Sequence, residues 1–144
     1  MLKLYSDLKK HYVLLEYRAV HNKMIIRCLK NEFENRSYNI DIFFEQVSGM
    51  ILPDKLDGIE IYVLDFDEVP KLILDCCFED FPDSKVFLIK DEVGNDYFIK
   101  AISMGAYQNS LSSLESWGDV SLIEHEGIEF LYKNKEIIAK IDEQ

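Results

Sequence analysis

The clearest structural signal in the sequence is the stretch from Tyr38 to Phe66, YNIDIFFEQVSGMILPDKLDGIEIYVLDF. Between Tyr38 and Phe44, apolar residues occupy every second position, and a period of two indicates a β-strand. The same alternation returns from Ile59 to Val63, after a segment, Leu52 to Gly58, whose Pro, Asp and Gly residues are typical of turns. The stretch predicts an antiparallel pair of strands at the centre of the domain. The residues expected on the polar side of the first strand are Asn39, Asp41 and Glu45.

The residues before this pair suggest a helix and a hairpin. Leu4 and Leu8 have the spacing of one helical face, which favours a short amphipathic helix near the N-terminus. Residues His11 to Lys30 alternate on both sides of His21-Asn22, and Asn tolerates the backbone conformation of a tight turn. We expect a hairpin there.

After Phe66 the pattern allows two interpretations. Asp67 and Pro70 are typical of a helix start, and Val69, Leu72, Ile73 and Cys76 follow a helical spacing. Leu72, Leu74, Cys76 and Phe78 could instead alternate along a strand. We favour the helix because its start signals agree with its periodicity.

The remaining pattern predicts mostly strands. Residues 86–90 and 97–102 flank a Gly-Asn turn and predict a hairpin, residues 104–109 resemble a loop, and Ser110 could cap one or two helical turns. The expected strands of the tail are 120–124, 128–132 and 136–141. The connections are too short for parallel crossovers. The sequence therefore predicts a β-rich α+β domain: a mainly antiparallel sheet, curled or two-layered, with two or three short helices.

Length and composition predict one globular domain, residues 1–144. A 48% hydrophobic fraction is too high for a disordered chain, and 144 residues are enough for one core. No apolar run approaches the length needed to cross a bilayer, and Met1 to Lys10 lacks the apolar region of a secretory signal. Cys28, Cys76 and Cys77 have neither metal-ligand nor CxxC spacing, and we expect them to be reduced core residues. A cytoplasmic protein is the expectation.

The charge of the chain limits its partners. Sixteen basic and 27 acidic residues give a net charge of −11, which repels nucleic acid and anionic membranes and attracts basic proteins. The sequence contains no catalytic serine motif, no phosphate-binding glycine motif and no metal-binding histidine pattern. We therefore expect no enzymatic activity, no cofactor and no metal site.

The acidic residues are concentrated in the middle of the chain. Between Asp54 and Asp83 lie ten acidic residues and two lysines, interleaved with aromatic residues. Acidic groups speed the approach of a basic protein, and a buried ring slows its release. The predicted partner-binding residues are Asp54, Asp57, Asp65, Asp67, Glu68, Glu79, Asp80, Asp83, Tyr62, Phe66, Phe78 and Phe81. The alternative is that the rings face the core and the acids only solvate the surface.

The run Phe44, Val47, Met50, Leu52-Pro53, Leu56 and Gly58-Ile59, in a compact acidic β-rich chain, resembles the small bacterial immunity proteins of polymorphic and contact-dependent toxin systems. The resemblance implies a cytoplasmic inhibitor without enzymatic activity that covers the active site of a basic cognate toxin, often a nuclease. It assigns no individual contact residue.

Two other functions remain open. The chain could be an assembly subunit that forms a homodimer through a strand edge such as Ile137 to Ile141. It could also be a small-ligand-binding domain or an enzyme of unrecognised type, with a pocket lined by Tyr and Phe.

Overall fold

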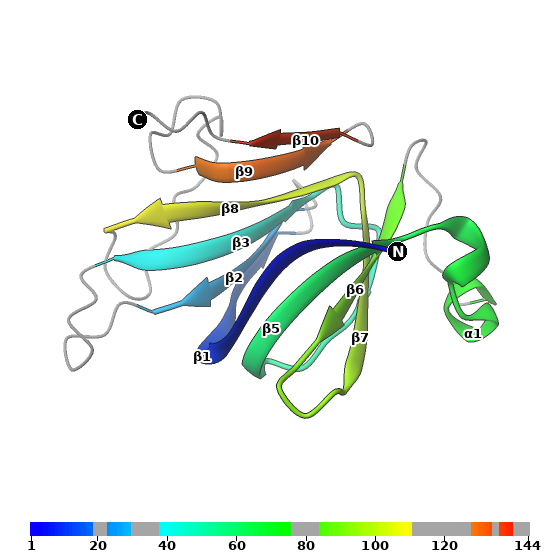
Figure 1. Cartoon of the computed structure of the whole chain (residues 1–144), viewed down its shortest axis with the longest axis horizontal. Helices are drawn as coiled ribbons and strands as arrows, with labels where there is room; N and C mark the ends of the chain where they lie inside the picture. The colour runs from blue at the N-terminus through cyan, green and yellow to red at the C-terminus, as the bar shows by residue number, and fades with distance from the viewer. Residues whose placement is uncertain (19–22, 30–37, 76–83, 111–127, 134–135, 140–144) are drawn as a thin grey trace.

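The protein, seen in a computed structural model, is built on one antiparallel sheet of ten strands (Figure 1). The structure describes residues 1–18, 23–29, 38–75, 84–110, 128–133 and 136–139. The strands are β1 (Leu2–Arg18), β2 (Lys23–Cys28), β3 (Asn39–Glu45), β4 (Gly49–Ile51), β5 (Lys55–Leu64), β6 (Lys85–Lys90), β7 (Asp96–Ala101), β8 (Ser103–Asn109), β9 (Ile128–Lys133) and β10 (Glu136–Ala139). A 3-10 helix, Phe66–Glu68, and the helix α1, Lys71–Asp75, lie between β5 and β6.

The sheet closes on itself. Its hydrogen-bonded order is β10-β9-β8-β3-β2-β1-β5-β6-β7-β4. In the sequence, only residues 46–48 separate β3 from β4, and only Ile102 separates β7 from β8. β3 pairs with β8 and β4 pairs with β7. The bent strand formed by β3 and β4 therefore runs along the bent strand formed by β7 and β8, which closes the sheet. The Ile102 N–H donates to the Glu45 carbonyl and the Ser48 N–H to the Lys100 carbonyl, which continues the ladder through the bend. β9 and β10 extend the sheet from the other edge of β8, and Tyr132 of β9 joins the main core.

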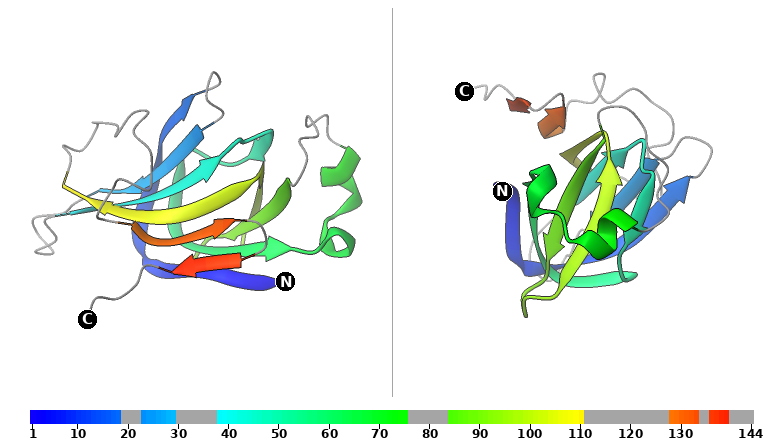
Figure 2. Two further views of the ribbon diagram at one scale, coloured as in Figure 1. Left: turned by 90° about the horizontal axis from the view of Figure 1, so that it is seen from above. Right: turned by 90° about the vertical axis from the view of Figure 1, so that its right-hand side faces the viewer.

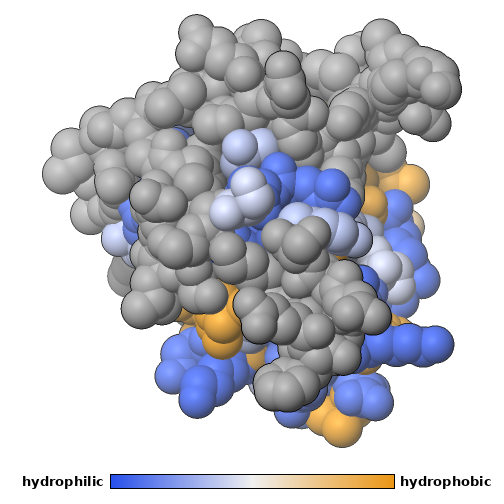
Figure 3. All heavy atoms as spheres, turned by 90° about the vertical axis from the view of Figure 1, so that its left-hand side faces the viewer, coloured by the Kyte–Doolittle hydropathy of each residue, from blue (hydrophilic) through white to orange (hydrophobic). Residues whose placement is uncertain are grey.

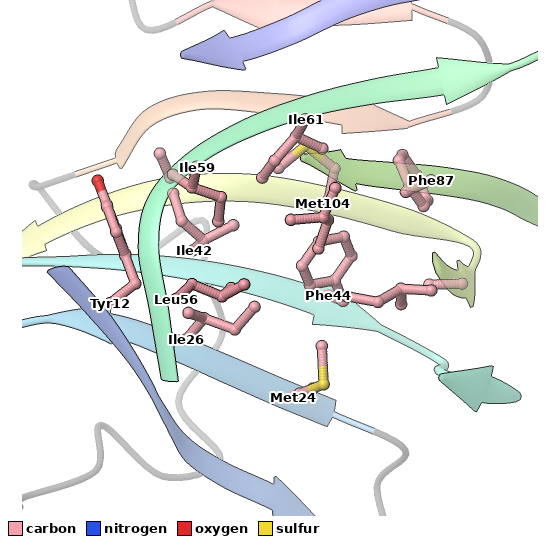
Figure 4. Packing of buried hydrophobic residues seen from close by; sticks show 14 of the residues in the cluster. Tyr12, Met24, Ile26, Ile42, Phe44, Leu56, Ile59, Ile61, Phe87 and Met104 are labelled. Atoms are coloured by element: carbon pink, nitrogen blue, oxygen red, sulfur yellow. The ribbon is translucent and has the colours of Figure 1, made fainter. Parts of the chain in front are cut away.

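The main core fills the inside of the closed sheet (Figure 4). Alternate residues of nearly every strand point inward, because successive side chains of a strand face opposite sides. Phe87 of β6 makes edge-to-face contacts with Phe44 of β3, at 5.5 Å between ring centroids, and with Tyr132 of β9, at 6.0 Å. Cys28 is a buried residue of this core, as expected, and Cys76 and Cys77 lie outside the described residues.

The α+β prediction is wrong, because the described residues form one antiparallel sheet and helix is a minor part of them. The helical segments are a 3-10 turn of three residues and a helix of five. Leu4 and Leu8 belong to the 17-residue strand β1. A spacing of four fits one face of a helix and also one face of a strand, and here pairing with β5 decides between them. The pattern after Asp67 allowed either a helix or a strand, and the favoured helix is confirmed as α1.

Two further predictions about the strands are wrong. The two halves of the 38–66 stretch are both strands, β3 and β5, but they do not pair, because β2 and β1 lie between them. Residues 104–109 form a strand, β8, and not a loop. β8 pairs with β3 on one side and β9 on the other, and pairing on both edges outweighs the weak strand propensity of Gly105.

Three predicted hairpins are confirmed. β6 pairs with β7, β9 pairs with β10, and the second half of β1 pairs with β2. The turn at 21–22, the helical turns after Ser110 and the strand at 120–124 lie outside the described residues. No helix within the described ranges is long and apolar enough to cross a membrane.

Candidate functional site

The most exposed apolar side chains near the acidic stretch lie in residues 65–72, a segment called the 65–72 corner below. It follows β5, the longest strand after β1, and contains the 3-10 helix and the start of α1. The Asp65 N–H donates to the Glu68 carboxylate at 2.9 Å, and the Glu68 N–H donates to the Asp65 carbonyl at 2.9 Å. These two bonds fix the first turn, and in Figure 1 the segment projects from the side of the sheet.

Two apolar residues hold the segment against the sheet. Val69 and Ile73 are 8% and 5% exposed and pack with Leu64 and Leu88, on the outer side of β5 and β6. Figure 2 shows the segment crossing that side of the strands. Because Val69 and Ile73 occupy the inward positions, the other apolar residues of the corner face away from the sheet.

The outward apolar residues are Phe66 and Leu72, which are 79% and 75% exposed. The exposed Met1 lies beside Glu68 of the same corner, with its ammonium 2.8 Å from the Glu68 carboxylate. Figure 3 shows the side of the molecule opposite to the corner, where the described surface is mostly hydrophilic and hydrophobic residues lie in separate small groups. The corner therefore lies beside apolar residues that pack against the sheet and also carries two apolar side chains that are mostly exposed.

The corner is negatively charged. Asp65, Asp67 and Glu68 are all exposed, and Lys71 is the exposed basic residue of the same segment. The hydrogen bond from the Met1 ammonium, followed by the one from the Asp65 N–H, lowers the pKa of the Glu68 carboxyl. Glu68 is therefore ionised at neutral pH, and the apolar side chains project from an anionic surface.

The structure separates the predicted acids that it describes. Asp54 and Asp57 lie at the start of β5, and Asp65 follows its end. Asp65 lies eight positions after Asp57 along the strand, a distance of at most about 26 Å at roughly 3.3 Å per residue. Asp57 is also paired with His11, whose Nδ1 is 2.6 Å away. The described carboxylates thus form two groups and not one continuous patch.

The predicted rings differ in exposure. Tyr62 is half-buried, and its hydroxyl donates to Glu60 at 3.3 Å. Phe66 is the ring that projects into solvent. The predicted residues outside the described ranges are Phe78, Glu79, Asp80, Phe81 and Asp83.

Sequence reasoning missed Leu72 as a surface residue. Its helical spacing predicted a core position, but α1 has only five residues and buries one face. The signal that could have identified it is Pro70, which disfavours the helical conformation at Val69. Val69 is extended and lies before α1, so its spacing to Leu72 is not that of one helical face.

Sequence reasoning also missed a buried polar network across β2, β3 and β8. Arg27 and Asp41 are both fully buried and face each other in the strand register. The Arg27 Nε and Nη2 donate to the two Asp41 oxygens at 2.6 and 2.8 Å, and Asn109 donates to Asp41 at 2.8 Å. Asn39 donates to Asn109 at 3.1 Å. Asn39 and Asp41 were expected on a solvent-facing side, so both faces of β3 are buried here.

A second polar group joins the core to the edge of β1. The Tyr12 hydroxyl donates to Asp7 at 2.8 Å and lies 2.8 Å from the Tyr5 hydroxyl, and Lys10 lies 3.2 Å from Asp7. Burial raises the pKa of Tyr12, and the neighbouring Tyr5 and Asp7 raise it further. Tyr12 therefore stays protonated as the donor to Asp7.

Within the described part of the chain, no group of three or more His, Cys, Asp or Glu side chains could hold a metal ion. A scan against protein-family models finds no match. Searches of curated proteins and of solved structures find no match either.

Proposed function

We propose that the protein is a non-catalytic binding protein that captures a basic partner protein through the 65–72 corner. The observation that carries this proposal is the exposure of Phe66 and Leu72 on a segment held to the sheet by Val69 and Ile73. A preformed segment loses little conformational freedom on binding, so most of the energy of burying its side chains remains available.

The exposed ring supplies the main apolar contact. Complete burial of a large apolar side chain contributes about 1.5–3 kcal/mol, and aromatic residues are over-represented among the residues that dominate interfaces. Leu72 adds a second apolar group on the same short segment. The partner should therefore offer an apolar depression large enough to hold about two side chains.

Charge selects the kind of partner. The net charge of −11 and the three acids of the corner attract a basic surface and accelerate the encounter. A Lys or Arg rim around the apolar depression would complement Asp65, Asp67 and Glu68. The resemblance to immunity proteins implies a more specific partner, a basic toxin such as a nuclease.

The test is affinity capture followed by a binding assay with the purified captured protein. Wild type should retain a basic protein, and Phe66→Ala should weaken its binding at least about tenfold, mainly through faster release. Val93→Ala is the matched control, because Val93 is 81% exposed but lies in the β6–β7 turn. Equal binding by the Phe66→Ala and Val93→Ala variants would contradict the proposal.

A second pair of variants tests the charge. Asp67→Asn should slow association and flatten its salt dependence, because a steering charge near the contact has been removed. Asp54→Asn removes the same charge at the other end of β5 and should have a smaller effect. Binding that is indifferent to ionic strength would overturn the assignment of a basic partner.

A further inference from the structure

Among the described residues, the strand edges that no other strand covers include those of the first half of β1, of β4 and of β10. β1 pairs with β2 only from Val13 to Arg18, so its first half has a neighbour on one side, β5. β4 pairs only with β7, and β10 pairs only with β9. An open strand edge offers backbone donors and acceptors to another strand, unless the edge is protected.

Two of these edges are protected. The pairing of β1 with β5 is irregular between Lys3 and Tyr5 and between Asp7 and His11, and the same half carries three lysines. Irregular register and lysine side chains both prevent the docking of another strand. β4 has only three residues and offers few bonds.

The edge of β10 is also short, with four residues, but it has neither an irregular register nor a lysine within the strand. It pairs with β9 in an unbroken register, from Glu136 opposite Lys133 to Ala139 opposite Phe130. Its sequence, Glu-Ile-Ile-Ala, has two β-branched residues, which favour strand pairing. Of these three edges, β10 is therefore the best suited to accept another strand.

Charge indicates which strand it accepts. Residues 128–139 contain two glutamates and two lysines, so this hairpin is neutral in a chain of net charge −11. Residues 54–83, with ten acids and two lysines, have a charge of −8. Two copies of the chain repel each other least if they approach through the neutral hairpin.

We propose that the protein forms a weak homodimer in which β10 pairs antiparallel with β10 of a second copy. A two-fold axis through the middle of the strand places each residue opposite its symmetric partner, so a single strand supplies both sides of the interface. Four residues form a small contact, and an interface of this size associates weakly.

Sedimentation equilibrium and amide hydrogen exchange test the dimer without any substitution. The average mass should rise with concentration, between about 5 and 500 µM, as expected for a mass-action equilibrium. Alternate amides of β10 should exchange more slowly at the higher concentrations, because alternate residues point away from β9. Amides of β4 are the internal control and should not change. A single monomer mass throughout, or new protection on β1 or the 65–72 corner, would overturn the proposal.

Proline variants locate the contact. Ile137 and Ile138 are consecutive, so the N–H of one points to β9 and the N–H of the other points outward. Proline at the position whose N–H points outward should remove dimerisation while the β9 amides stay protected from exchange. Proline at the position whose N–H points to β9 should disturb the hairpin itself. A dimer that survives the outward proline would contradict the assignment.

Salt separates this proposal from the proposed function. Screening reduces repulsion between two acidic copies, so added NaCl should strengthen the homodimer. The same salt should weaken the capture of a basic partner. Either salt effect can be absent while the other is observed, so the two proposals can fail independently.

Discussion

At the scale of single residues, Gly58 is the position that permits the irregular pairing of β1 with β5. Its φ is +78°, and a Cβ atom would lie 2.8 Å from the Leu8 carbonyl oxygen. Between Asp7 and His11, β1 has three residues where β5 has only Gly58, so the backbones approach closely there. The position therefore requires a residue without a side chain.

We predict that Gly58→Ala destabilises the protein more than Gly94→Ala. Both residues have a positive φ, which costs a non-glycine residue about 1–3 kcal/mol, but nothing lies within 4 Å of a Cβ at Gly94. Gly94→Ala thus measures the backbone strain alone, and Gly58→Ala adds the clash with Leu8. Urea unfolding measures both free energies. Equal losses in the free energy of unfolding would show that β1 moves away from the added methyl group without a cost in stability.

The ion pair of Arg27 and Asp41 gives a second prediction at this scale. Removing one partner leaves a buried charge without its counter-ion, so Arg27→Met should cost about 3–5 kcal/mol in the free energy of unfolding. The double variant Arg27→Met with Asp41→Leu should cost less than Arg27→Met alone, because neither charge remains. Denaturant unfolding of the two single variants and the double variant measures this coupling. A double variant that loses the sum of the single losses would contradict it.

At the scale of elements, local signals located the strands better than their partners. The hairpins β6–β7 and β9–β10 were predictable because their turns and their alternation lie close together in the sequence. The neighbours of β3 and β5 were not, because those pairings join residues far apart in the chain. Alternation identifies a strand, but it does not say which strand lies beside it.

The candidate site was predictable to a similar degree. The exposed Phe66 and the acids beside it were identified from composition alone, but their separation from Asp54 and Asp57 depends on the length of β5. Burial of Asp41 was not predictable, because alternation in β3 marks two faces without showing that both are covered. Such information comes only from the tertiary structure.

The β6–β7 hairpin gives a prediction about pH. Asp91 accepts hydrogen bonds from the N–H groups of Val93 and Asn95 and from the Asn95 side chain. Burial opposes ionisation of Asp91, but these bonds outweigh it, and the pKa of Asp91 lies below its usual 3.8. A lowered pKa means that ionised Asp91 stabilises the turn above pH 3.8 and that this stabilisation disappears as the pH falls through the lower value.

We therefore expect the Val93 and Asn95 amide resonances to shift together with a midpoint below pH 3.8, in an NMR titration. The Asp91→Asn variant, which has no carboxyl at this position, is the control and should show no such transition. A midpoint at or above 3.8 in the wild-type protein would mean that the hydrogen bonds of the turn do not favour the carboxylate.

At the scale of the whole molecule, the excess of negative charge acts against the folded state. Folding brings 27 acidic and 16 basic residues into a smaller volume, so the net charge of −11 repels itself more strongly in the folded protein than in the unfolded chain. Surface pairs such as Lys3 with Glu60, 2.9 Å apart, oppose this repulsion, but exposed pairs contribute little each. Repulsion should therefore dominate the response to salt.

We predict that the melting temperature rises as NaCl is added from low concentration to about 0.3 M, where the Debye length is between roughly 3 and 8 Å. Thermal unfolding followed by circular dichroism at neutral pH measures this. Asp67→Lys reduces the net charge and should raise the melting temperature at low salt and flatten its salt dependence, because Asp67 lies among other acids of the 65–72 corner. Lys90→Gln is the opposite control: it removes a cation 2.8 Å from Asp96 and should steepen the dependence. A melting temperature that falls with added NaCl would show that attractive surface pairs outweigh the net repulsion.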